Sequence, residues 1–109
     1  MKDRRSAPRV RVNLPARWEG VLSREKATVT DLSRSGCFVL TGGKVEVKEL
    51  VWLEINLTET QTVNFWGEVV DIASGIGFAL KFNSSTSEDQ TILASFLDKF
   101  FLTEPQKQS

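Results

Sequence analysis

Histidine is absent from this 109-residue chain, and cysteine occurs only once, as Cys37. The lack of histidine removes the commonest general base, the histidine-based catalytic triads and most zinc or iron sites. A single cysteine cannot form an internal disulfide or a two-cysteine redox pair. No other residue pattern indicates a nucleophile with its base, so we expect a protein that is not an enzyme and needs no cofactor or metal.

Long hydrophobic runs are also missing. The charged start of the chain, Met1–Arg5, is not followed by the apolar stretch of a signal peptide, and no run approaches the length of a membrane span. Cys37 precedes Phe38, Val39 and Leu40, which predicts a buried, unreactive thiol. These features predict a soluble, cytoplasmic protein made of one domain over residues 1–109.

The net charge of zero conceals an uneven distribution along the chain. Residues 1–37 carry nine basic and four acidic side chains, whereas residues 38–109 carry five basic and ten acidic ones. This split favours a localised anion site in the first third of the chain. A basic tail that is simply solvated is the other interpretation of the same charges.

Short alternating segments separated by turn residues predict a β-rich fold over residues 10–83. In residues 50–57, for example, Trp52 shares one face with two polar residues, and the other face is apolar. Pro15 is expected at an edge or bend, and Gly67 at a bulge. The regular spacing favours a six-stranded antiparallel barrel. The expected strands are 10–18, 27–30, 37–40, 50–57, 62–72 and 76–82.

The last part of the chain changes to a helical period, which predicts a helix over residues 86–102. Ser85 with Glu88 is the preferred capping box, and Thr86 with Asp89 is the weaker alternative. The apolar stripe is expected to pack across one mouth of the barrel, although a partner-binding helix is the other interpretation. Residues 103–109 are polar and are expected to fray.

The segment from Arg4 to Arg9 is rich in arginine, with Arg4, Arg5 and Arg9 close together and Pro8 just before Arg9. The guanidinium group bonds phosphate through two parallel donors and stacks on bases. Residues 1–9 contain little apolar surface, so we expect a flexible ligand-binding segment. Taken alone, this signal is weak, because basic termini are common and are usually just solvated.

A second segment, Asp31-Leu32-Ser33-Arg34-Ser35-Gly36, separates two predicted strands. With Leu32 pointing into the core, Asp31 and Ser33 would project from the other face and offer a carboxylate and a hydroxyl to a guanine edge. Gly36 permits a positive φ or a close backbone approach. The alternative is a plain connection in which Asp31 and Ser33 bond only the local backbone.

The order and spacing of these segments resemble the PilZ domain family. Arg5-x-x-x-Arg9 is followed after 22 residues by Asp31-x-Ser33-x-x-Gly36, then by further strands and a terminal helix. The stretches 9–15, 67–70 and 75–82 look like the same family, so that the resemblance covers residues 4–101. It implies a six-stranded antiparallel barrel that binds cyclic di-GMP, a bacterial second messenger.

The resemblance also implies a role for each matching residue. Arg5 and Arg9 match the arginine pair that grips guanine faces and phosphates, and Arg4 occupies a position associated with binding a stacked ligand dimer. Asp31, Ser33 and Gly36 match the motif that holds a guanine edge. Asp71 departs from the family, because it lies where an aromatic or basic residue is frequent. An acid pointing toward the ligand would weaken binding.

These observations lead to a mechanistic hypothesis with two competitors. The hypothesis is that cyclic di-GMP draws the arginine segment onto the barrel and creates a surface for an unidentified protein partner. The first competitor is an adaptor with the same barrel that binds no nucleotide. The second is an oligonucleotide-binding barrel that uses Trp18, Trp52 and Trp66 for stacking, which the acidic second part of the chain disfavours. We expect no DNA or RNA partner and no membrane insertion.

Overall fold

The computed structural model describes the backbone of residues 8–108 and the side chains of residues 8–100. These residues form six strands followed by one long helix. The elements are β1 (Val10–Glu19), β2 (Arg24–Leu32), β3 (Gly36–Leu40), β4 (Leu50–Asn56), β5 (Thr62–Ala73), β6 (Gly77–Ser84) and α1 (Ser87–Gln108). The expectations for Arg4, Arg5 and the rest of residues 1–7 lie outside the described residues.

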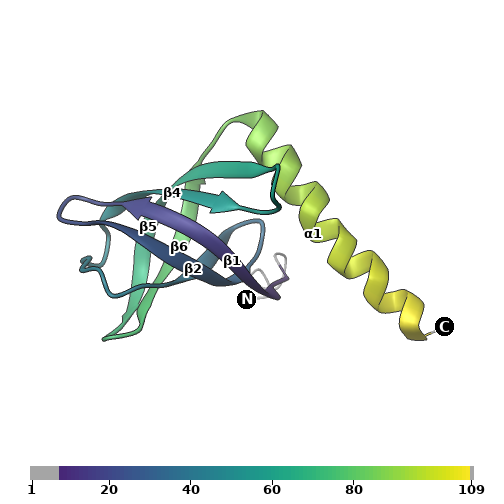
Figure 1. The fold of residues 1–109 in the computed structure, drawn as a ribbon, viewed down its shortest axis with the longest axis horizontal. Coiled ribbons are helices and arrows are strands. Elements are labelled where there is room, and N and C mark those ends of the chain that lie inside the picture. Colours follow the sequence, from purple (N-terminus) through teal and green to yellow (C-terminus); the bar gives the residue numbers. More distant parts are fainter. Residues whose placement is uncertain (1–7, 109) are drawn as a thin grey trace.

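The strands close into a barrel in the order β1-β2-β3-β6-β5-β4, and every pair is antiparallel (Figure 1). Each half is a three-stranded meander, one made of β1, β2 and β3 and the other of β4, β5 and β6. The halves join where β3 pairs with β6 and where β1 pairs with β4. The predicted fold, an antiparallel six-stranded barrel with one C-terminal helix, is therefore confirmed.

The alternation in the sequence places the apolar residues inside the barrel. In β4, Val51, Leu53 and Ile55 are fully buried, whereas Trp52 on the opposite face is only half-buried. Trp18 lies in the core and meets the Phe78 ring edge-on, with the ring centroids 5.2 Å apart. Trp18 is therefore unavailable for stacking on a base, which contradicts the use suggested for it in an oligonucleotide-binding barrel.

The predicted interruptions fall where the strand pairing changes. Pro15 pairs with Thr28 on β2, but the β1–β4 ladder begins only at Ala16, so the proline removes no donor from that ladder. The β5–β6 register shifts between Trp66 and Gly67, as expected for a bulge at that glycine. The strand bounds differ from the prediction by at most three residues, and the largest difference is β2, which begins at Arg24.

The start of α1 differs from the preferred prediction. The Thr86 hydroxyl accepts a hydrogen bond from the Asp89 amide at 3.0 Å, so Thr86 caps the helix. Ser85 instead donates its hydroxyl to the Asn64 carbonyl of β5. The Asp89 carboxylate accepts the Asn64 amide at 2.9 Å, so it ties the helix to β5 rather than completing a capping box. The predicted Ser85–Glu88 box was wrong. Serine and threonine both cap helices, and the hydroxyl of Ser85 is already used in its hydrogen bond to β5.

The N-terminal half of α1 lies against one end of the barrel, and its C-terminal half extends away from it (Figure 1). Leu93 and Leu97 are buried in the core, and Ile92 and Phe96 are half-buried against it. The helix continues to Gln108, six residues past the predicted end at residue 102. A helix can continue through its backbone hydrogen bonds even where it has no apolar face. The polar composition of residues 103–108 was therefore a poor guide to where the helix ends. Within residues 8–108, no helix is long and apolar enough to cross a membrane.

The cap at Thr86 gives a stability prediction. Thr86→Ala removes the acceptor of the Asp89 amide and should lower the free energy of unfolding by about 1 kcal/mol in urea denaturation. Thr91→Ala, at an exposed position inside the same helix, should leave stability unchanged or raise it slightly, because alanine is the better helix former. Equal losses in the two variants would contradict the assignment of Thr86 as the cap.

Candidate functional site

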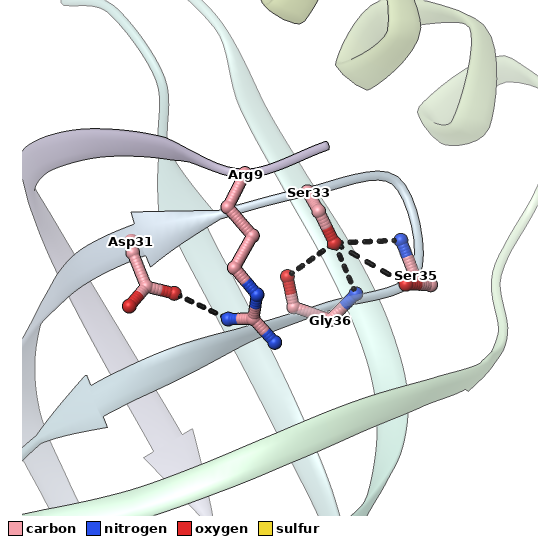
Figure 2. Close-up of polar contacts among 5 residues, drawn as sticks. All are labelled: Arg9, Asp31, Ser33, Ser35 and Gly36. Carbon is pink, nitrogen blue, oxygen red and sulfur yellow. Dashed lines mark hydrogen bonds and ion pairs between the residues drawn. The ribbon is translucent and has the colours of Figure 1, made fainter. Parts of the chain in front are cut away.

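The two polar motifs meet where β1 begins and β2 ends. The Arg9 guanidinium donates to the Asp31 carboxylate, with Nη1 2.7 Å from Oδ1 (Figure 2). The side chains are 55% and 34% exposed, respectively, so the ion pair lies at the surface. The structure therefore brings together two predicted site residues that are 22 positions apart in the sequence.

Ser33 occupies a different environment from the one expected. Its side chain is 1% exposed, and its hydroxyl accepts hydrogen bonds from the Ser35 and Gly36 amides at 3.1 and 3.2 Å (Figure 2). The chain turns directly after Leu32, so Ser33 no longer alternates with Asp31 and does not project beside it. Ser33 thus shapes the turn, as in the interpretation of a local connection, whereas Asp31 faces solvent.

Gly36 is needed because two backbones approach each other closely. A Cβ atom at this position would collide with the Leu80 carbonyl oxygen of β6. The φ angle of Gly36 is not positive, so the close approach, and not the left-handed conformation, accounts for this glycine. The turn is further fixed by the Ser33 amide, which donates to the Gly36 carbonyl at 2.9 Å.

Cys37 lies under the site and is fully buried, as predicted. Burial raises the pKa of the thiol far above its ordinary value, and the nearby Asp31 carboxylate raises it further, whereas Arg9 opposes this shift. A thiol held in its protonated form is a poor nucleophile. Cys37 therefore packs the core beneath the ion pair and supplies no reactive group.

The strand register places two further residues beside the ion pair. Arg11 lies directly opposite Asp31 on β1, and Phe38 lies opposite it on β3. Arg11 is exposed and Phe38 is half-buried, so both contribute to the outer surface. Neither residue was predicted to belong to the site, although a two-residue period places Arg9 and Arg11 on the same side of the chain where β1 begins.

Asp71 faces the same outer surface as the site. The register runs from Asp31 through Phe38 and Ala79 to Asp71, across three strand spacings or about 14 Å. Asp71 is exposed, and its carboxylate accepts the Ile72 amide at 3.0 Å. The acid therefore lies at the edge of the site and not between Arg9 and Asp31.

Arg34, in the same turn as Ser33, lines a neighbouring hollow of about 220 Å³ together with Phe82, Gln90 and Leu93. This hollow connects the turn to the start of α1. The part of the chain that the structure describes holds no group of three or more side chains suited to a metal ion. The site thus combines exposed guanidinium groups, one carboxylate and one aromatic ring. Such a set suits a ligand that carries both a negative charge and a flat polar ring.

The chain matches the family model for the PilZ domain over residues 3–99. It belongs to the PilZ domain family. The match includes both arginine positions and the Asp31–Gly36 motif of this PilZ domain. A comparison with curated proteins gives no significant sequence match.

Two solved structures share the fold of this PilZ domain. The Bacillus subtilis inhibitor of motility (MotI/DgrA) superposes with a TM-score of 0.76 at 19% identity, covering 92% of this chain and 52% of that one. The PilZ domain of CeSA from a cellulose-synthesizing bacterium superposes with a TM-score of 0.62 at 14% identity, covering 89% of this chain and 98% of that one. The chain thus spans about half the length of the Bacillus subtilis protein.

The close approach at Gly36 gives a second stability prediction. Gly36→Ala forces a methyl group against the Leu80 carbonyl and should destabilise the protein by roughly 1–3 kcal/mol in thermal or urea unfolding. Gly42→Ala is the matched control, because nothing lies within 4 Å of a Cβ atom at that position and its φ is ordinary. Similar stabilities for the two variants would show that the turn tolerates a side chain.

Proposed function

We propose that this PilZ domain is a receptor for cyclic di-GMP. The observation that carries the proposal is the ion pair between Arg9 and Asp31, which joins the two family motifs into one exposed site. The ligand has two phosphates and two guanines, so it needs cationic donors and an acceptor for a guanine edge. The Arg9 guanidinium supplies such donors and the Asp31 carboxylate such an acceptor, and the two groups are in contact.

Arg9 is available to a phosphate because its present partner holds it weakly. A surface ion pair contributes about 0–1 kcal/mol, and only one bond of the five-donor guanidinium group is used by Asp31. A dianionic ligand could therefore take the remaining donors without breaking a buried contact. Arg11, on the same side of the chain where β1 begins, would add charge to the same region.

Asp31 would accept the donors of a guanine edge. Its Oδ1 atom accepts from Arg9, which leaves the second oxygen for the ligand. Phe38 on the adjacent strand would provide an apolar surface under the base. Ser33 and Gly36 would act by holding the turn in place, since the hydroxyl is buried in the turn and the glycine contacts β6.

Arg4 and Arg5 complete the proposed ligand-binding set. On binding, they would be drawn to the phosphates next to Arg9, which already contacts Asp31, so that the segment before Arg9 becomes ordered on the barrel. The chain would act without catalysis, through a protein partner that recognises the ordered segment. A nucleotide-independent adaptor is the second candidate, favoured by the buried Ser33 hydroxyl and the exposed Asp71 carboxylate.

Isothermal titration with cyclic di-GMP tests the receptor. Wild-type protein should bind saturably and in preference to GTP and cyclic GMP. Arg9→Ala should weaken binding roughly 10- to 150-fold, because charge-assisted hydrogen bonds contribute about 1.5–3 kcal/mol each.

Arg24→Ala is the matched control for that titration. Arg24 also pairs with a carboxylate, that of Glu19 at 3.2 Å, but at the far end of the β1–β2 hairpin. Its loss should leave the affinity unchanged. No binding to the wild type would favour the adaptor, and equal effects of the two substitutions would move the site away from Arg9.

The ordering step has its own test. Hydrogen exchange of peptides that cover residues 1–9 should slow when cyclic di-GMP is added, because bound arginines would hold the segment against the barrel. Peptides from β4, far from the site, serve as the internal control. Unchanged exchange in residues 1–9 at saturating ligand would reject the ordering mechanism while leaving the receptor intact.

A further inference from the structure

A group of exposed apolar side chains lies at the other end of the β1–β2 hairpin from the candidate ligand site. It comprises the tip of the hairpin, the connection before β4 and the outer face of β4 and β5. The exposed fractions are 80% for Val21, 72% for Leu22, 52% for Val47, 54% for Leu50 and 44% for Trp66. With the half-buried Trp52, these residues are called here the apolar platform.

The apolar platform is hollowed rather than flat. One hollow of about 570 Å³ is lined by Val21, Leu50, Trp52 and Trp66, and a second of about 450 Å³ is lined by Val21, Leu22 and Val47. Val21 lines both, so the hollows lie next to each other, and the pair is called the apolar groove. Contiguous exposed apolar surface of this kind is typical of interaction sites.

The backbone under the apolar platform is held firmly. The Glu49 carboxylate accepts the Val21 amide at 2.7 Å and the Glu46 amide at 2.9 Å, so one side chain joins the hairpin tip to the connection before β4. Lys48 beside it adopts a φ of 80°, which is costly for a residue with a side chain. The Lys48 amide donates to the Val69 carbonyl at 2.7 Å, which fixes that conformation.

The tryptophan pair gives the groove a rigid aromatic wall. Trp52 and Trp66 are cross-strand partners with ring centroids 5.1 Å apart. Large, preorganised aromatic side chains of this kind dominate the binding energy of protein interfaces. They lose little entropy on binding because their positions are already set by the sheet.

The strands around the groove exclude one mode of binding. β1 pairs with β2 and β4, β4 with β1 and β5, and β5 with β4 and β6. Among the described residues, the β1–β4 ladder reaches Glu19 opposite Trp52, so only Leu50 and Val51 of β4 extend past β1, which is too short an edge for a partner to add a strand. A partner must therefore insert side chains, and an amphipathic helix lying in the groove is the mode that does so.

The charges at the groove indicate the character of that helix. Of the charged residues that line the two hollows, Glu19, Glu46 and Glu49 are acidic and only Lys48 is basic, although Arg24 beside the hollows pairs with Glu19 at 3.2 Å. A helix with basic residues beside its apolar face would complement this rim. The same rim would repel an acidic helix, an anionic membrane surface and a second copy of the platform.

We propose that the apolar platform is a docking site for a basic amphipathic helix of a partner protein. Apolar residues at helical spacing would fill the groove against Trp66 and Val21, and flanking lysines or arginines would face Glu46 and compete with Arg24 for Glu19. The site lies at the opposite end of β1 from Arg9 and shares no residue with the candidate ligand site. Docking does not depend on cyclic di-GMP binding, so both can occur on one chain.

Peptide selection followed by affinity measurement tests the docking site. The purified chain is panned against a phage-displayed library of random peptides about 16 residues long, a length that forms a helix of about 24 Å. Enriched sequences should carry apolar residues at helical spacing with flanking lysine or arginine. The most enriched peptide is then synthesised with a fluorophore, and its binding is measured by anisotropy.

Three variants locate the peptide on the chain. Trp66→Ala should weaken binding about 30-fold, as for a central aromatic anchor. Leu22→Lys keeps the fold, because the side chain is 72% exposed, and should also weaken a basic peptide. Ile76→Ala is the matched control, an apolar residue 53% exposed in the β5–β6 turn outside the platform. Arg9→Ala should bind the peptide normally even where it no longer binds cyclic di-GMP.

Four outcomes would overturn the proposal. The first is that no sequence is enriched, and the second is that enriched peptides are acidic or bind Trp66→Ala and Leu22→Lys as tightly as the wild type. The third is a dimer in sedimentation velocity that Trp66→Ala dissociates, which would assign the platform to a second copy. The fourth is co-sedimentation with phosphatidylglycerol vesicles that Trp66→Ala abolishes, which would assign it to a membrane.

Discussion

Two strand pairings join the meanders into a barrel, the β1–β4 seam and the β3–β6 seam, and the β3–β6 seam has a glycine at each end. Gly36 and Gly77 sit at its two ends, where a Cβ atom would collide with the Leu80 and Val39 carbonyl oxygens, respectively. The pairing closes the sheet, which removes exposed edges from a small domain. It also fixes the turn that begins at Ser33, because Gly36 belongs both to the turn and to the seam.

Each seam borders one of the two surfaces that the chain presents. The site around Arg9 and Asp31 lies beside the β3–β6 seam and offers charge that is loosely held at the surface. The apolar platform spans the β1–β4 seam, where Glu19 pairs with Trp52. The two surfaces differ in how strongly their side chains are held. A surface ion pair is weak, so a ligand can replace one of its partners at little cost in free energy. The tryptophan pair is held in one arrangement by the sheet, so a partner must have a complementary shape.

Much of the fold was predictable because it depends on local period. The alternation in β4 placed Val51, Leu53 and Ile55 inside. The family motifs predicted Asp31 as a site residue, and that role stays a prediction. Ser33 was misplaced because the alternation stops at a turn that only its hydrogen bonds reveal. The helix cap was misassigned because Ser85 bonds to Asn64, which lies 21 residues away in the sequence.

The sequence by itself determined the class of fold, which residues of a strand share a face and the two polar motifs, since these follow from spacing along the chain. Only the tertiary structure decided which motif atoms meet, because Arg9 reaches Asp31 through the register of β1 on β2. It also decided that Trp18 is buried while Trp66 is exposed. Both lie in alternating strands, and the side that faces the core is set by closure of the barrel, which depends on contacts distant in sequence.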